Sequence, residues 1–242
     1  MVEKKKGKLN KSPKKTNLKK RKTLSKDLVL NAAIQLADEF GLEELSMRSL
    51  AFHLGVEAMS LYNHIKNKDE LLDGMVDSVV SQIVLPKIGG NWKKEMKKRA
   101  GSARKVLNLH PWSTILIVSR INVGPAMLAY FDASLGCLHS AGFSLPVADH
   151  IINAIDSHIY GYILQELNFP INPKEYSETA KGFLPSLEKS PFIYLTSLTK
   201  KVVVGKYNGL HDFEFGLDLI LNGLSPQMNI STKSLKKKPN PR

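Results

Sequence analysis

The chain has 242 residues, of which 43% are hydrophobic, and its formal net charge is +13. A chain of this size can bury the core of one or two domains. Its single cysteine, Cys137, excludes an internal disulfide. No apolar run approaches the roughly 20 residues that cross a bilayer, and the basic N-terminus lacks the apolar segment of a secretory signal. We therefore expect a cytoplasmic protein with no membrane partner.

The positive charge lies at the two ends of the chain. Residues 1–22 contribute +10 and residues 233–242 contribute +5, which leaves −2 for the residues between them. Segments so rich in lysine and so poor in apolar residues are typical of disorder. We expect disordered basic tails at 1–22 and 229–242. Such tails can also bind nucleic-acid phosphates without sequence preference, so a role in DNA affinity stays open.

The first predicted helix runs from about Ser25 to Phe40. Ser25 suits an N-cap, and Leu28, Ala32 and Leu36 recur at a spacing of four toward Phe40. Strand-like alternation is scarce along the whole chain, and prolines and glycines fall mostly at predicted helix ends. The sequence therefore predicts an all-α fold.

Residues 46–68 predict two short helices joined by a tight turn, followed by the start of a third. Gly55 lies at the turn, where a residue must be free to adopt positive φ. The apolar positions of the two helices are Leu50, Ala51, Leu54, Val56, Leu61 and Ile65. The residues left outward on the second helix are Met59, Ser60, Tyr62, Asn63 and His64. This pattern is typical of a helix-turn-helix whose second helix enters a DNA major groove.

The rest of the chain predicts a larger helical unit. Asn67 and Glu70 have the spacing of an N-cap and its third helical residue, so a helix is expected from Lys68 to about Val84. Further helices are expected over 92–108, 126–141, 147–167 and 210–224, with short helices and loops over 168–210. The helix 92–108 carries seven lysines and arginines, which we interpret as a solvated face, with a second DNA contact as the alternative.

The order of these motifs resembles the TetR family of bacterial transcriptional repressors. In the N-terminal part the resemblance rests on Gly41–Leu45, Arg48–Ala51, Leu54–Val56, Leu61–His64 and Lys66–Leu72. In the C-terminal part it rests on His110–Trp112, Ser119–Arg120, Gly124–Pro125, Ala141–Gly142, Asp156–Gly161 and Phe213–Leu224, which look like a tetracycline-repressor-like domain. It covers most of the chain except the tails and roughly 170–210.

The resemblance implies a homodimer that acts on DNA. A helix-turn-helix DNA-binding domain at 23–68 would sit on a helical ligand-binding and dimerisation domain at 69–228. Two recognition helices would enter successive major grooves, so the operator would be a near-palindrome. An unknown small-molecule effector in the larger domain would change the separation of the DNA-binding units and release the DNA.

The resemblance also assigns DNA contacts residue by residue. Arg48 and Asn63 would approach base edges, because Arg pairs bidentately with guanine and Asn with adenine. Ala58, Met59 and Ser60 would make apolar or short polar contacts, and Ala58 stands where the tetracycline repressor has a base-reading glutamine. Tyr62, His64 and Lys68 would bind phosphates and fix the register. The docking mode thus follows from the resemblance, whereas the operator sequence does not.

The effector pocket is expected to be mainly apolar. Its candidate residues are Trp112, Leu116, Met127, Phe131 and Tyr160 as walls, with Asp156 and Gln165 as polar anchors. The tetracycline repressor binds a drug–magnesium chelate through a histidine, and that position falls near Leu116 in this chain. No set of carboxylate or imidazole groups has metal-ligand spacing. We therefore expect no metal, no cofactor and an effector other than tetracycline–magnesium.

Two predicted helices are candidates for the dimer interface. Phe213, Phe215, Leu217, Leu219, Ile220 and Leu224 lie on the last helix, and Ile151, Ile155, Ile159 and Ile163 lie on the helix 147–167. Together they could form a two-fold four-helix interface, with packing inside one chain as the alternative.

Three other functions are weighed against a ligand-responsive repressor. An enzyme finds no support, because the chain has no phosphate loop, nucleophile elbow or paired carboxylates. A non-specific, nucleoid-associated DNA binder driven by the basic tails would show steep salt dependence and no operator. A ligand-binding module with a vestigial DNA-binding unit would bind no specific DNA, but the intact apolar stripe argues against decay.

Overall fold

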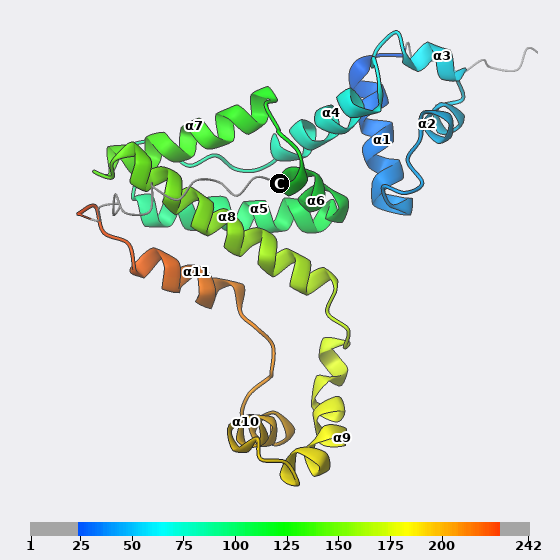
Figure 1. The fold of residues 1–242 in the computed structure, drawn as a ribbon. Coiled ribbons are helices and arrows are strands. Elements are labelled where there is room, and N and C mark those ends of the chain that lie inside the picture. The colour runs from blue at the N-terminus through cyan, green and yellow to red at the C-terminus, as the bar shows by residue number, and fades with distance from the viewer. Residues whose placement is uncertain (1–23, 228–242) are drawn as a thin grey trace, which may run out of the picture.

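The structure is a computed structural model that describes residues 24–227, and within them it contains helices and loops but no strand (Figure 1). The elements are α1 (Lys26–Phe40), α2 (Met47–Leu54), α3 (Ala58–Leu61), α4 (Lys68–Val80), α5 (Trp92–Leu109), α6 (Pro111–Ser119), α7 (Pro125–Ser140), α8 (Leu145–Leu167), η1 (Pro173–Glu175), α9 (Tyr176–Glu188), α10 (Ile193–Val203) and α11 (Phe213–Asn222). The predicted all-α fold is confirmed. The tails predicted at 1–22 and 229–242 lie outside the described residues.

None of the described helices combines the length and the apolar composition that a membrane-spanning segment needs.

Helices α1 to α3 form a small unit, here called the headpiece, at one end of the molecule (Figure 1). The Ser25 hydroxyl accepts a hydrogen bond from the Leu28 amide at 3.2 Å, so the predicted N-cap of α1 is present. Helix α2 starts with a capping box formed by Ser46 and Ser49 and ends at Gly55, whose φ of 65° is left-handed. The predicted tight turn is therefore formed by the residue that was expected to allow it.

Helix α4 joins the headpiece to the remaining helices, here called the body. One face of α4 is buried along its whole length, with Leu71, Met75, Val76 and Val79 nearly inaccessible. It packs against α1 on the headpiece side and against α5, α6 and α7 on the body side. The helix ends at Val80 rather than near Val84, because residues 81–83 form a turn. Headpiece and body consequently share one continuous apolar core.

The core of the body is organised around a buried ion pair. Arg99 on α5 is fully buried, and its guanidinium donates to Asp156 on α8 at 2.7 Å and to Ser134 on α7 at 3.2 Å. Tyr130 on α7 donates a second hydrogen bond to Asp156 at 2.8 Å. The expectation of a solvated basic face on this helix is thus wrong for Arg99, because a carboxylate on the neighbouring helix draws it inward.

Other basic residues of α5 also join helices within the chain. Lys97 pairs with Asp218 on α11 at 2.8 Å, and its pKa is raised by hydrogen bonds from the ammonium to Asp218 and Glu214. Arg104 pairs with Glu166 on α8 at 2.6 Å. The opposite charges that complement α5 therefore come from α8 and α11.

The four isoleucines of α8 lie inside the chain rather than on an exposed face. Ile151, Ile155, Ile159 and Ile163 are each at most 3% exposed and pack toward α5 and α7. The expectation that they form a dimer interface is wrong, because their spacing marks the internal face of α8. On α11, Phe213 and Leu217 are likewise buried, whereas Phe215 and Leu219 are 65% and 63% exposed.

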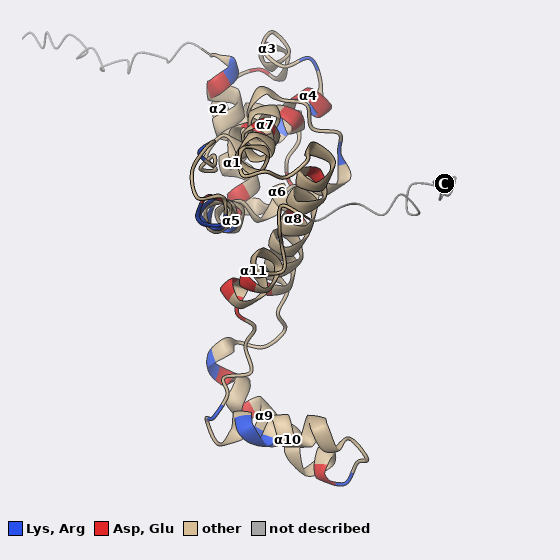
Figure 2. Cartoon of the chain, turned by 90° about the vertical axis from the view of Figure 1, so that its left-hand side faces the viewer, with Lys and Arg blue, Asp and Glu red and all other residues tan. Residues whose placement is uncertain are grey.

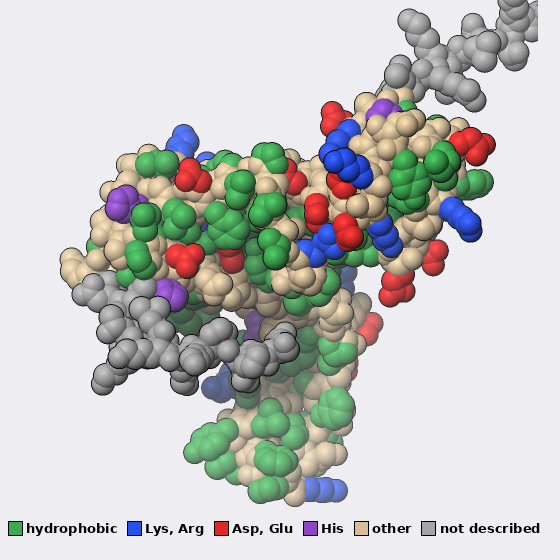
Figure 3. Space-filling view, turned by 45° about the horizontal axis from the view of Figure 1, so that its top comes forward, with side chains coloured by type: hydrophobic (Ala, Val, Ile, Leu, Met, Phe, Trp, Pro, Cys, Tyr) green, Lys and Arg blue, Asp and Glu red, His purple; other side chains and the backbone are tan. Residues whose placement is uncertain are grey.

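Helices α9 and α10 form a hairpin, here called the arm, that projects away from the body (Figures 1 and 2). The two helices pack mainly on each other, and Val202 is the only side chain of theirs that is buried. Large apolar side chains of the arm stand in solvent, including Phe183, Ile193 and Tyr194, the last of which is 85% exposed. Figure 3 shows these apolar side chains gathered on the projecting hairpin. Such a surface is unusual for a monomer.

The buried pair generates a stability prediction. We expect Arg99→Met to lower the free energy of unfolding by about 3–5 kcal/mol, because it leaves the Asp156 carboxylate buried without its cation. Lys26→Met is the matched control, since Lys26 and Glu70 form a pair near the surface whose loss should change the free energy of unfolding far less. Urea unfolding at one fixed protein concentration measures both, and similar losses in the two variants would contradict the assigned role of Arg99.

Candidate functional site

The headpiece presents most of the predicted DNA-contacting residues on its outer surface. Met59 is 74% exposed and Tyr62 is 44% exposed. Arg48, Asn63 and Lys68 are also exposed, and the remaining predicted contacts, Ala58, Ser60 and His64, are half-buried. The outward-facing set thus combines a guanidinium, an amide, an ammonium, a phenol and a thioether, which are groups that can contact base edges and phosphates.

The second helix of the helix-turn-helix is shorter than its apolar pattern predicts. Helix α3 ends at Leu61, and Tyr62, Asn63 and His64 lie in the turn that follows. The amides of His64 and Ile65 both donate to the Leu61 carbonyl at 2.9 Å, so the turn is held close to the helix end. Because Leu61 and Ile65 are fully buried, their spacing reflects anchoring of this turn to the headpiece core as well as the helix itself.

A network of hydrogen bonds fixes the start of α4 beside this surface. The Asn67 side chain accepts from the Glu70 amide at 2.8 Å, which is the predicted cap. Glu70 in turn accepts from the Lys66 amide at 2.8 Å and pairs with Lys26 of α1 at 2.7 Å. Hydrogen bonds from Lys26 and Lys66 hold the pKa of Glu70 below its usual value. Lys68 therefore stands on a helix end that is tied to α1.

Phe52 is a surface residue that the sequence analysis missed. It is 90% exposed and lies four residues after Arg48 on α2, one helical turn farther along the same side. The available signal was its position outside the apolar stripe of α2. An exposed phenylalanine beside a candidate base-reading arginine adds apolar area to the same surface.

A cavity of about 520 Å³ lies in the body between the α6–α7 connection and α8. Four of the residues predicted for the effector pocket line it, namely Met127, Phe131, Asp156 and Tyr160. Burial raises the pKa of the Tyr160 hydroxyl and of the Asp156 carboxyl, the latter against the opposing effect of Arg99. The cavity thus combines apolar walls with polar groups that are held in a poorly hydrated place.

The other three predicted pocket residues are not brought to this cavity. Trp112 is buried where α6 meets α1, and Leu116 is buried in the core. Gln165 is exposed and lines grooves on the far side of α8. Sequence reasoning also missed polar residues that do line the cavity, namely Arg120, Asn122, Asp149, His150 and Asn153. Arg120 and Asn122 lie in the loop after α6, where no helical period marks their direction, and the other three lie on the polar side of the first turns of α8, which looks solvated in the sequence.

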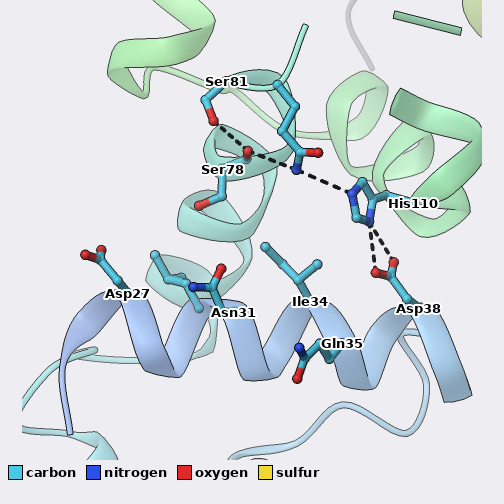
Figure 4. A pocket seen from close by; sticks show the side chains of 10 residues that line it. Asp27, Asn31, Ile34, Gln35, Asp38, Ser78, Ser81 and His110 are labelled. Carbon is cyan, nitrogen blue, oxygen red and sulfur yellow. Dashed lines mark hydrogen bonds and ion pairs between the residues drawn. The ribbon is translucent and has the colours of Figure 1, made fainter. Parts of the chain in front are cut away.

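A polar contact closes the seam between headpiece and body (Figure 4). The Asp38 carboxylate on α1 lies 2.9 Å from His110 Nδ1 and accepts a hydrogen bond from the Trp112 indole at 2.7 Å. Gln82, just past the end of α4, lies 3.4 Å from the other imidazole nitrogen. A polar groove of about 650 Å³ runs along this seam between α1 and α4. The start of α6 is therefore tied to α1.

Three aspartates of α4 make a second set of contacts with the body. Arg120, in the loop after α6, donates to Asp73 at 3.0 Å and to Asp69 at 3.1 Å. Asp77 accepts the first free amides of α7, from Ala126 at 2.9 Å and Met127 at 3.0 Å. A carboxylate at a helix N-terminus is stabilised by the helix dipole. The loop that borders the cavity is thereby attached to the helix that enters the headpiece.

Among residues 24–227, no group of three or more His, Cys, Asp or Glu side chains is placed to hold a metal ion.

The seam generates a second prediction. We expect Asp38→Ala to lower the free energy of unfolding by about 1–3 kcal/mol, because the indole donor of Trp112 is left without its partner. Hydrogen exchange should also rise at the junction of α1 and α6. Asn31→Ala, an exposed residue of the same groove, is the control and should change neither quantity measurably. An Asp38→Ala protein as stable as the control would contradict this role.

Two protein-family comparisons cover most of the chain. Residues 29–75 match the family described as bacterial regulatory proteins, tetR family. Residues 85–228 match the family described as tetracyclin repressor-like, C-terminal domain. The first range contains the helix-turn-helix surface, and the second contains the cavity, the arm and α11.

Individual proteins are similar over nearly the same length. The HTH-type transcriptional repressor DrrR1 of Streptomyces coeruleorubidus is 32% identical over 84% of this chain and 77% of its own. The class C tetracycline repressor protein of Escherichia coli is 29% identical over 88% of this chain and 95% of its own. Among solved structures, the Streptomyces coelicolor TetR family protein ActR in complex with actinorhodin aligns with a TM-score of 0.70 and 28% identity, covering 84% of this chain and 97% of that one.

Proposed function

The chain belongs to the TetR family of bacterial transcriptional regulators, and on that premise we propose that it is a homodimeric repressor released from a palindromic operator by a small-molecule effector. The observation that carries the proposal is the complete helix-turn-helix, with its capped α2, left-handed Gly55 and outward Arg48, Met59 and Asn63. We propose 23–68 as the DNA-binding domain and 69–228 as the ligand-binding and dimerisation domain.

The exposed headpiece residues support separate roles in base contacts and in phosphate contacts. Arg48 and Asn63 have the fork and amide that read guanine and adenine edges. Met59 supplies an exposed apolar contact, and Tyr62 and Lys68 reach phosphates. We propose Ala58, Ser60 and His64 as secondary contacts, because they are half-buried at the same surface.

The cavity beside α8 supports an effector site in the body. The solved structure of ActR is a complex with actinorhodin, and the alignment covers nearly all of that chain. We propose the cavity lined by Met127, Phe131, Asp156 and Tyr160 as the effector site of this protein. We do not propose tetracycline–magnesium as the effector, because Leu116, near the position of the chelating histidine in the tetracycline repressor, has no metal-binding group.

The exposed surfaces of α8, α11 and the arm support a homodimer. Phe215 and Leu219 of α11 stand in solvent beside a groove of about 830 Å³ that also includes Ser157 and Gly161 of α8. Small residues on α8 allow a second helix to approach closely, and exposed aromatic side chains are typical of interface cores. The unsupported arm adds further apolar area. We propose that a second copy covers these surfaces through a two-fold axis.

The alternative function is a non-specific DNA binder of the nucleoid driven by the basic tails. The body and headpiece carry little net charge between the tails, so such binding would depend on residues 1–22 and 233–242. Both functions place the protein with DNA in the bacterial cytoplasm, and neither is enzymatic. They differ in whether the protein distinguishes one DNA sequence from another.

Selection from random duplex DNA tests the proposal. The full chain and a version restricted to residues 23–232 are each used at near-physiological salt. Recovery of a palindrome by both, with half-site centres about 34–36 Å apart, would support a dimeric sequence-specific repressor. Binding without enrichment, and only by the full chain, would favour the tail-driven alternative.

Two substitutions test the readout of the operator. We expect Asn63→Ala to weaken operator binding by about 1–3 kcal/mol and to relax preference at one base pair. Lys68→Ala should weaken specific and random DNA about equally and reduce the salt slope by roughly one, because it removes a phosphate contact. Binding isotherms at several salt concentrations measure both, and an equal effect of Asn63→Ala on operator and random DNA would refute its role in base readout.

A charge placed on α11 tests the dimer. We expect Leu219→Glu to raise the dimer dissociation constant at least about tenfold, because association would bury a carboxylate without a partner. Leu128→Glu is the matched control, since Leu128 is 55% exposed on α7, away from the proposed interface. Sedimentation velocity over a concentration series reports the assembly, and a Leu219→Glu protein that dimerises like the control would reject this interface.

A further inference from the structure

Asn122 lines the cavity beside α8, and its side-chain oxygen is a buried acceptor with no hydrogen-bond partner among the described residues. The Asn122 amide nitrogen donates to the carbonyls of Leu116, Ile117 and Arg120, at 3.4, 3.0 and 3.0 Å. Because all three carbonyl oxygens are acceptors, they fix the orientation of the Asn122 amide, with its nitrogen toward them. Its oxygen, Oδ1, is buried and accepts nothing. Buried polar atoms without a partner are rare in proteins, and a ligand is one of the ways in which they are satisfied.

Asp156 adds a second acceptor to the same cavity. The hydrogen bonds that it receives, from Arg99 and from Tyr130, both enter Oδ1. No described residue donates to Oδ2, although the side chain is only 7% exposed. A carboxylate has about four acceptor positions, so the Oδ2 atom is available to a donor inside the cavity.

The positive charges near the cavity are already bound to carboxylates. Arg120 lines the cavity, but its guanidinium is held by Asp69 and Asp73 of α4. Asp149 also lines the cavity and forms no ion pair with a described residue. An incoming anion would therefore meet carboxylates and no free arginine or lysine, with His150 as the remaining basic side chain of the lining. The apolar part of the lining, including Ile117, Met127 and Phe131, offers a surface for a ring system.

We propose that the effector of this protein carries hydrogen-bond donors, as hydroxyl or ammonium groups on an apolar ring body, and that a carboxylate in their place is rejected. The inference rests on the proposed function, because it gives a chemical class to the effector of that site. Asn122 Oδ1 and Asp156 Oδ2 accept from these donors. A site built to hydrogen-bond a donor discriminates strongly against an analogue that lacks it, since its buried acceptors are then left unpaired.

Four probes that share one ring system test this class. They are 2-naphthol, 2-(aminomethyl)naphthalene, 2-methoxynaphthalene and 2-naphthoate, and their binding to the full chain is measured by titration calorimetry. We expect the naphthol or the ammonium to bind at least about tenfold more tightly than the ether, and the carboxylate to bind no better than the ether. Comparing the affinities of the naphthol and the ammonium distinguishes a preference for a neutral donor from a preference for a cationic one.

Two amide variants place the preference in the cavity. Asn122→Ala should abolish the preference for the tighter-binding donor probe over the ether, whereas Asn153→Ala should retain it. Asn153 is the matched control, because it lines the same cavity but is exposed. Because Asn122 also holds the loop after α6, thermal unfolding of both variants is recorded. If Asn122→Ala does not fold, the wild-type ranking of the four probes decides the class by itself.

Several outcomes would overturn the inference. Binding of both donor probes, the naphthol and the ammonium, no tighter than that of the ether would reject it, as would tightest binding of the naphthoate or no binding of any probe at millimolar concentration. A preference unchanged in a folded Asn122→Ala protein would place the donors elsewhere. Operator selection is measured separately. If the protein selects an operator but does not prefer donors, only this inference is rejected. If the protein prefers donors but selects no operator, the proposed function is rejected.

Discussion

The body depends on the buried pair between Arg99 and Asp156. Two charges that leave water incur a penalty of several kcal/mol each, which is offset only when their geometry and hydrogen bonds are nearly complete. Here α5 supplies the cation, α8 supplies the carboxylate, and Tyr130 and Ser134 of α7 add one hydrogen bond to each of them. A shift of α5 or α8 would separate the two charges, and a shift of α7 would remove a hydrogen bond from each of them. The pair therefore fixes the positions of α5, α7 and α8, which also hold the cavity.

Helix α4 extends this constraint to the headpiece. Its buried face contributes to one core with α1 on one side and with the body on the other. On its exposed side, Asp69 and Asp73 are held by Arg120, and Asp77 is held by the first amides of α7. The contact of Asp38 with His110 and Trp112 closes the seam from the side of α1. The headpiece thus has a defined direction relative to the body within one chain.

The sequence predicted the local structure well where one residue controls it. Ser25, Gly55 and Asn67 act through their own backbone or nearest neighbours, so the helix start, the turn and the next helix start followed from residue type. Prediction from the sequence failed where a partner distant in sequence decides whether a residue is buried. Arg99 looks like any other basic residue of α5, and only Asp156, 57 residues later, makes it a core residue. The isoleucines of α8 show which face is apolar, but not whether that face meets the same chain or a second one.

The same difference separates the two parts of the candidate site, the helix-turn-helix surface and the cavity. The helix-turn-helix contacts lie within about twenty residues of one another, so their arrangement could be predicted from motif order. The cavity needs the loop after α6 to meet α7 and α8, and its polar residues carry no periodic signal. Met127, Phe131, Asp156 and Tyr160 were proposed from residue type and the family resemblance, whereas Arg120 and Asn122 were not.

The loop after α6 offers a physical route from the cavity to the headpiece. Asn122 borders the cavity and holds the last carbonyls of α6, while Arg120, two residues earlier, holds the aspartates of α4. A ligand changes an equilibrium between two conformations only if it binds one of them better. A donor that pairs with Asn122 Oδ1 in one position of this loop, and cannot reach it in another, supplies that difference. Its coupling to DNA binding would then equal the differential affinity, typically about 1–3 kcal/mol. Arg120 pairs with Asp69 and Asp73, which lie one helical turn apart on α4. Even a small displacement of the loop therefore changes contacts on the helix that enters the headpiece.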